Sequence, residues 1–234
     1  MTWSIGSYAF GQCEKLETAN IPAGVTSLGN AVFYNCYALK SALSIPAGIT
    51  EIGTKMFSGC YLVPSITVPD SVTVIGEEAF RYCQSITSIS IPKGVTSIGI
   101  RAFSYCTSLT SVTIPEGVTV IDTGLFYGCT KLETVTLPQN VTTISNGAFN
   151  KCSSLTGITI PGKVTIIDVY AFNDCDSLKS VVVPDSVVAR FDNVFDRLGI
   201  RVLDFAKQKT GLARESATDV GVGEWIERPT GLYA

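Results

Sequence analysis

Hydrophobic and polar residues repeat along this chain with a period of 23 residues. A Phe and a Cys stand three residues apart in every copy, and the intervals between successive cysteines are 23, 24, 23, 23, 23, 23 and 23 residues. One short module has therefore been copied about eight times. The pairs are Phe10/Cys13, Phe33/Cys36, Phe57/Cys60, Phe80/Cys83, Phe103/Cys106, Phe126/Cys129, Phe149/Cys152 and Phe172/Cys175.

One period, residues 108–130, predicts three segments. In residues 109–114, apolar side chains alternate with Ser and Thr, which is typical of a short strand with one buried face. Pro115 then marks a corner, since proline has no N–H for a central strand. Residues 118–121 predict a second extended piece. Residues 126–129 have apolar spacing of three, which predicts a single helical or 3-10 turn.

A glycine often follows the second extended piece, at Gly29, Gly53, Gly76 and Gly99. Glycine adopts positive φ more easily than any other residue. We therefore expect a tight bend with positive φ at this position of the repeat.

A module of 23 residues leaves its apolar side chains open at both ends, so neighbouring copies must stack to bury them. Every turn runs in the same direction, so the stacked strands are parallel, and such crossovers are overwhelmingly right-handed. The sequence therefore predicts a repeat solenoid, mainly β or α/β, in which parallel strands alternate with short helical or 3-10 turns.

The pattern L-x-x-V-x-I-P-x-x-V-x-x-I-G-x-x-A-F-x-x-C, as in Leu109 to Cys129 or Ile86 to Cys106, resembles the BspA-like leucine-rich repeats. The resemblance covers about residues 5 to 203 and implies a right-handed leucine-rich-repeat superhelix. Proteins of this group are often found on the cell surfaces of bacteria and protists. The resemblance therefore implies a role in adhesion and in binding host or matrix proteins.

Residues 1–205 form the expected solenoid, with about eight to nine turns and a start in the middle of a repeat. Two interpretations of this start stay open: a fragment of a longer protein, or a makeshift cap built from Met1, Trp3 and Ile5. Ile200, Val202 and Phe205 predict a last strand. Residues 206–234 have lost the repeat and are expected to be a mobile or disordered tail, or a linker, unless Trp225, Ile226 and Tyr233 dock.

Composition narrows the function classes. A net charge of −3 argues against nonspecific binding to nucleic acid, and no apolar run is long enough to enter and cross a bilayer. The chain also lacks the pattern of a signal peptide. Localisation stays open, because the resemblance implies a cell-surface or secreted protein while the missing signal peptide favours the cytoplasm.

The cysteines are expected to be free buried thiols. Equivalent residues of adjacent turns have parallel Cα–Cβ vectors about 4.8 Å apart, whereas a disulfide requires converging Cβ atoms.

There is no His and no Cys-x-x-Cys pair, so we expect no metal and no other cofactor. The acidic pairs Glu77/Glu78 and Asp174/Asp176 are expected on an exposed surface. The chain is therefore predicted not to be an enzyme.

Tyrosine is the most suggestive departure from repetition, because six tyrosines flank the Phe and Cys positions and are expected along one edge. Tyrosine combines a large contact area with few rotatable bonds and a hydroxyl group, so an exposed row is a candidate surface for protein or glycan ligands. Shielding of the core is the alternative reason for tyrosines here. The candidate binding residues, called the tyrosine edge below, are Tyr34, Tyr37, Tyr61, Tyr82, Tyr105 and Tyr127.

A row of threonines occupies another position of the repeat: Thr26, Thr50, Thr73, Thr96, Thr119, Thr142 and Thr165. A flat Thr grid can bind ice, but Thr is also favoured on a parallel sheet, where its side chains stack on one another.

Three functional hypotheses follow. The first is recognition of a protein or glycan in cell-surface adhesion, the alternative is an intracellular scaffold for protein–protein interactions, and the third is an ice-binding protein.

Overall fold

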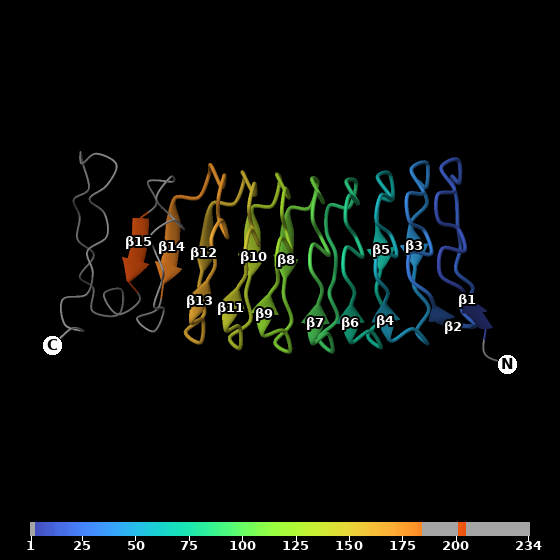
Figure 1. The fold of residues 1–234 in the computed structure, drawn as a ribbon, viewed down its shortest axis with the longest axis horizontal. Helices are drawn as coiled ribbons and strands as arrows, with labels where there is room; N and C mark the ends of the chain where they lie inside the picture. The colour runs from blue at the N-terminus through green and yellow to red at the C-terminus, as the bar shows by residue number, and fades with distance from the viewer. Residues whose placement is uncertain (1–2, 184–200, 205–234) are drawn as a thin grey trace.

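Each 23-residue period forms one turn of a parallel β-solenoid, and about eight turns stack along its long axis (Figure 1). The computed structural model describes residues 3–183 and 201–204. Partners in adjacent turns lie one period apart, as in Val135 beside Val112 and Ile144 beside Ile121. The predicted repeat solenoid is therefore confirmed, because the sequence period is also the register of the sheets.

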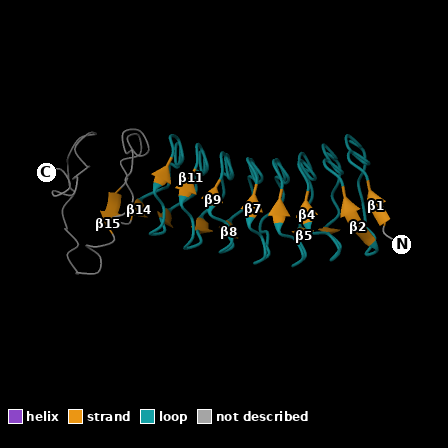
Figure 2. Ribbon diagram, turned by 60° about the horizontal axis from the view of Figure 1, so that its bottom comes forward, coloured by secondary structure: helices purple, strands orange, loops and turns teal. Residues whose placement is uncertain are grey.

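Two columns of short strands run along the solenoid, and loops make up most of each turn (Figure 2). The column before the prolines contains β3 (Leu43–Ser44), β5 (Ile66–Thr67), β8 (Ser111–Thr113), β10 (Thr134–Thr136), β12 (Gly157–Thr159), β14 (Ser180–Val183) and β15 (Arg201–Asp204). The column after them contains β1 (Trp3–Ile5), β2 (Val25–Leu28), β4 (Glu51–Ile52), β6 (Val74–Ile75), β7 (Ser97–Ile98), β9 (Val120–Ile121), β11 (Thr143–Ile144) and β13 (Ile166–Ile167).

The segment around each Phe is a series of tight turns, so the predicted helical or 3-10 turn is wrong in its details. In the second turn, the Cys36 N–H donates to the Phe33 carbonyl at 3.2 Å, and the Leu39 N–H donates to the Cys36 carbonyl at 3.1 Å. The Phe33 N–H instead donates to the Met56 carbonyl of the next turn, at 2.9 Å. This bond between turns interrupts helical pairing, and the described residues contain no helix.

Positive φ also lies elsewhere than expected. It occurs two residues before and two residues after the Phe, as at Arg101 (φ 55°) and Tyr105 (φ 60°) around Phe103. Most of these residues are not glycines, and the left-handed region is uncommon for them. Because the bend recurs in turn after turn, it belongs to the repeat and is imposed by the hydrogen bonds between turns.

The glycines after the second extended piece are needed for close packing. A Cβ added at Gly99 would lie 2.6 Å from the Glu77 backbone nitrogen, and one at Gly76 would lie 2.7 Å from the Thr54 nitrogen. A Cβ added at Gly29 would come equally close to Ser7. None of these three glycines has positive φ. Later turns carry Asp122, Ser145 and Asp168 at this position.

Gly99→Ala is therefore expected to lower the free energy of unfolding by about 1–3 kcal/mol, because the new methyl group forces two backbones apart. Gly94→Ala is the matched control, since its Cβ would lie 3.7 Å from the nearest atoms, an ordinary contact. Urea unfolding followed by circular dichroism measures both. Equal midpoints for the two variants would contradict the close-packing explanation.

The core is a continuous row of stacked phenylalanine rings, one from each turn. Neighbouring rings lie 5.2–5.8 Å apart between centroids and are tilted by 2–15°. We call these residues the Phe column. All but the first are almost fully buried, and they are Phe10, Phe33, Phe57, Phe80, Phe103, Phe126, Phe149 and Phe172.

At the far end, β15 pairs in parallel with β14, with Val202 opposite Val181. The backbone thus confirms the predicted last strand over Arg201–Asp204. The predicted tail, residues 206–234, lies outside the described residues, and so does Phe205.

Candidate functional site

Five members of the tyrosine edge form an unbroken series of ring contacts across four adjacent turn boundaries. Ring centroids lie 5.2 Å apart for Tyr37–Tyr61, 6.2 Å for Tyr61–Tyr82, 4.8 Å for Tyr82–Tyr105 and 5.2 Å for Tyr105–Tyr127. We call these five residues the tyrosine ladder. All are half-buried, so each is held by its neighbours while part of its surface faces solvent.

The ladder crosses three positions of the repeat. Tyr37 and Tyr61 follow the Cys of their repeat, Tyr82 and Tyr105 precede it, and Tyr127 follows the Phe. Within each same-position pair the rings are nearly parallel, at 6° and 11°, whereas the Tyr61–Tyr82 contact is edge-on at 84°. A change of repeat position therefore rotates the rings without breaking the row.

Tyr34, the sixth predicted residue, is also half-buried, but its ring contact is with Tyr8. The two centroids lie 6.2 Å apart, edge-on at 82°. Tyr8 belongs to the first turn and is 58% exposed. The structure thus places five of the six candidate residues in one series and the sixth in a separate pair.

Ionic residues surround the ladder. The Arg81 guanidinium lies 4.7 Å from the centroid of the Tyr82 ring and donates a hydrogen bond to the Tyr82 hydroxyl at 3.2 Å. Glu78 holds it there, with an N–O distance of 2.6 Å, and also lies 3.7 Å from the Lys55 ammonium. Arg81 is therefore positioned by an ion pair on one side and an aromatic face on the other.

Glu78 is buried, with 7% of its surface exposed, so the prediction that Glu77 and Glu78 form an exposed pair is wrong for Glu78. Two cations compensate its burial. Glu77, Asp174 and Asp176 are exposed as expected. A sequence signal existed, because Lys55 and Glu78 have opposite charges one period apart, like Lys40 and Glu17, whose charged atoms lie 2.7 Å apart.

At the other end of the ladder, Lys151 meets Tyr127, with its ammonium 5.5 Å from the ring centroid. The proximity of Lys151 to the Tyr127 hydroxyl lowers the pKa of Tyr127, and the neighbouring Tyr105 hydroxyl lowers it further. Burial and the nearby Tyr127 hydroxyl raise the pKa of Tyr105. Lys151 therefore places a positive charge beside the last ring of the ladder.

The thiols form a second row in the core, called the Cys column below. All eight cysteines are free, and only Cys13 is exposed. Each of the others hydrogen-bonds to the Phe carbonyl of the preceding turn, as Cys106 does to Phe80 at 3.2 Å. Burial raises the pKa of Cys106 and Cys175 to about 12. These thiols stay protonated at neutral pH and tie adjacent turns together.

The predicted threonine row is exposed throughout, on the column after the prolines. Its hydroxyls turn toward the backbone of the preceding turn. Thr142 donates to the Thr119 carbonyl at 3.2 Å and Thr165 to the Thr142 carbonyl at 3.4 Å. The row therefore adds hydrogen bonds along the sheet.

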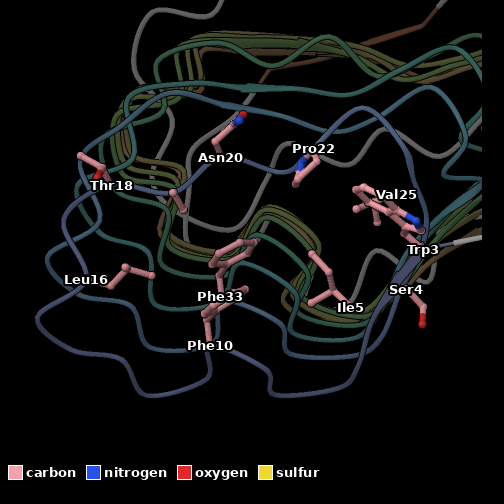
Figure 3. Close-up of a pocket in the computed structure, with 11 residues that line it drawn as sticks. Trp3, Ser4, Ile5, Phe10, Leu16, Thr18, Asn20, Pro22, Val25 and Phe33 are labelled. Carbon is pink, nitrogen blue, oxygen red and sulfur yellow. The ribbon is translucent and has the colours of Figure 1, made fainter.

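An apolar cavity of about 710 Å³ lies at the N-terminal end of the solenoid (Figure 3). Its lining includes Trp3, Ile5, Leu16 and the stacked rings of Phe10 and Phe33. Trp3 is 56% exposed and Phe10 is 39% exposed, so Trp3 and Ile5 line this end without closing it. Met1, the remaining residue of the expected cap, lies outside the described residues.

Two further features were assessed in the described part of the chain. Its residues 3–183 and 201–204 contain no group of three or more Cys, Asp or Glu side chains arranged to hold a metal ion. In the same ranges, no helix has the length and apolar character needed to cross a bilayer.

Comparisons with known proteins agree with this architecture. The model of the BspA type leucine rich repeat region matches residues 2–107 and 73–201, with six copies. A leucine-rich repeat protein from Bacteroides ovatus is 29% identical, with a TM-score of 0.63 over 86% of this chain. A T. pallidum leucine-rich repeat protein is 31% identical, with a TM-score of 0.67 over 75% of this chain and 82% of its own.

The chain spans 54% of the length of the Bacteroides ovatus protein. A search of curated proteins found no match. The family-model match covers well over half of the chain, and repeats of this family are generally non-catalytic protein-binding modules. This chain belongs to the BspA-type leucine-rich repeat family.

Proposed function

We propose that the tyrosine ladder binds a protein or glycan ligand without covalent chemistry, and that this recognition serves adhesion at a cell surface. The family supports the binding part of the proposal, and the resemblance to cell-surface repeat proteins supports adhesion. The observation that carries the site is the unbroken row of five half-buried tyrosines over successive turns.

The ladder is ordered before any ligand arrives. A ring held on both sides by other rings, as Tyr61 and Tyr82 are, has already lost most of its rotational freedom. A ligand therefore does not bear the entropic cost of ordering these side chains, which is commonly about 0.5–1.5 kcal/mol for each flexible one. Tyrosines in such a setting are frequent hot spots of protein interfaces.

The exposed part of the ladder presents phenol hydroxyls and ring edges. The parallel pairs cover part of each other's faces, and Arg81 covers the Tyr82 ring further. The Lys151 ammonium beside Tyr127 adds a positive charge at this end of the ladder. This arrangement suits a ligand surface rich in carbonyl, carboxylate or hydroxyl oxygens.

Affinity capture followed by mass spectrometry tests the proposal. The chain is immobilised and exposed separately to a cell-surface extract and to a cytosolic extract. A variant replaces four ladder residues with Ser, and we expect the affinity for the captured ligand to fall by tenfold or more. The substitutions are Tyr37→Ser, Tyr61→Ser, Tyr82→Ser and Tyr105→Ser.

The matched control carries four substitutions on the threonine row, and circular dichroism must show that both variants are folded. Loss of a surface ligand from the tyrosine variant alone supports the proposal. Equal capture by both variants contradicts the ladder as the site, and ligands found only in the cytosolic extract contradict adhesion. The control substitutions are Thr50→Ala, Thr73→Ala, Thr96→Ala and Thr119→Ala.

A further inference from the structure

Two tyrosine pairs of the ladder have a geometry that the remaining aromatic contacts of the edge lack. Tyr37–Tyr61 and Tyr82–Tyr105 come from the same repeat position of adjacent turns, with centroids 5.2 and 4.8 Å apart and tilts of 6° and 11°. Their phenol groups therefore lie side by side. The Tyr105–Tyr127 contact, by contrast, is tilted by 68°.

We propose that these two pairs are sites of oxidative coupling, at which hydrogen peroxide and a haem peroxidase form dityrosine links between adjacent turns. The proposal stands apart from ligand binding, because it rests on ring geometry within the chain and requires no ligand.

The reaction balances as follows. Each phenol gives up one electron and one proton to become a tyrosyl radical. The two radicals join through a carbon–carbon bond between positions ortho to the hydroxyls, and the two ortho hydrogens move to the oxygens, which restores both phenols. Overall the pair loses two electrons and two protons. One hydrogen peroxide molecule accepts them at the peroxidase haem and becomes two water molecules.

Other easily oxidised side chains near the pairs are shielded. The cysteines beside the ladder, including Cys60, Cys83 and Cys106, are buried, and their raised pKa values keep them as thiols rather than the more reactive thiolates. Met56 is fully buried as well. Cys13 is the exposed thiol, so the experiment uses a Cys13→Ser background. Within the described ladder region, oxidation is therefore directed to tyrosine.

A dityrosine link would join adjacent turns covalently, which the Cys column cannot do. Each buried thiol is engaged with a Phe carbonyl, and the parallel side chains of adjacent turns hold the sulfurs apart. Tyrosine side chains reach further from the backbone, and with ring centroids already 5.2 and 4.8 Å apart only a small shift is needed to bring two ortho carbons together. A covalent link of this kind restricts the unfolded chain as a disulfide does.

The test treats dilute Cys13→Ser protein with a haem peroxidase and limiting hydrogen peroxide. Proteolysis and mass spectrometry then identify linked peptides, which are lighter than their sum by two hydrogens. We expect links Tyr37–Tyr61 and Tyr82–Tyr105 and the appearance of dityrosine fluorescence. The linked monomer should also unfold at a higher urea concentration. An unchanged midpoint would overturn the stabilising role.

Three conservative variants test whether the links form selectively at the two parallel tyrosine pairs. Tyr61→Phe should abolish only the first link and Tyr105→Phe only the second, while Tyr34→Phe, from the edge-on Tyr8–Tyr34 pair, should change neither. Phe keeps the ring, so each variant stays stacked. The proposal is overturned if Tyr8–Tyr34 links form in equal yield. It is also overturned if links form only between molecules, or if the urea-unfolded chain gives the same pattern.

Discussion

Raising the pH above 9 is expected to destabilise this protein steeply. The usual thiol pKa is 9.0, and burial raises it to about 12 for Cys106 and Cys175. It is also raised by burial for Cys83 and Cys129. Above pH 9 the unfolded chain releases these protons while the folded chain keeps them. Stability is therefore fully present below pH 9 and is lost as the pH rises toward 12.

The effect is large because the thiols are many. Each buried thiol lowers the free energy of unfolding by about 1.4 kcal/mol per pH unit once the unfolded thiol is ionised. The most deeply buried thiols together give a slope on the order of 8 kcal/mol per pH unit, comparable with the whole stability of a typical domain. They are Cys60, Cys83, Cys106, Cys129, Cys152 and Cys175.

Urea unfolding at a series of pH values between 8 and about 10.5 measures this slope, with reductant present to prevent disulfide formation. Cys106→Ser is the matched variant, because serine occupies the same place beside the Phe80 carbonyl but does not ionise. Its slope should be shallower by about 1.4 kcal/mol per pH unit. A stability that stays constant across this range would show that the folded thiols ionise as readily as unfolded ones.

Phe103→Ala is expected to lower the free energy of unfolding by about 3–5 kcal/mol. Its ring is 1% exposed and lies between Phe80 and Phe126, at 5.2 and 5.6 Å. Removal leaves a cavity across two turn interfaces and takes away two stacking contacts. Because each turn contacts only its neighbours, the damage should divide the array into two units that unfold separately.

Phe10→Ala is the control at the same repeat position. Phe10 is 39% exposed and stacks on Phe33 alone, so its removal should lower stability by about 1 kcal/mol or less. Urea unfolding gives the midpoint and the m value, which is the change in the free energy of unfolding per unit of urea concentration. The m value should fall for Phe103→Ala if the array divides. Similar losses for the two variants would show that the column is not stabilised by packing on both sides.

The period made much of this fold predictable. Because Phe and Cys recur at one spacing, the register of partners one period apart and the burial of residues such as Phe126 and Cys129 follow from the sequence. The parallel strands and their boundary at the prolines follow from the same pattern. The free buried thiols followed from the geometry of parallel turns, and the structure confirms them except at Cys13, which is free but exposed because no turn precedes it in the described residues.

The details of each turn were less predictable. Glycine was expected to mark positive φ, but the left-handed residues include Arg101, Tyr105 and Lys151, because hydrogen bonds to the next turn impose the bend. Gly99 is instead required where two backbones approach. Local preference therefore gave the wrong position, since contacts between turns outweigh the preference of a single residue.

By itself, the sequence determined the repeat, the parallel solenoid, its buried residues and the set of tyrosines worth examining, because one periodic pattern encodes them all. Only the tertiary structure decided which tyrosines touch, that Tyr34 stands apart with Tyr8, and that Arg81 and Lys151 lie against Tyr82 and Tyr127. These contacts join different repeat positions of different turns. They depend on how far and in which direction each side chain reaches, and the period does not specify this.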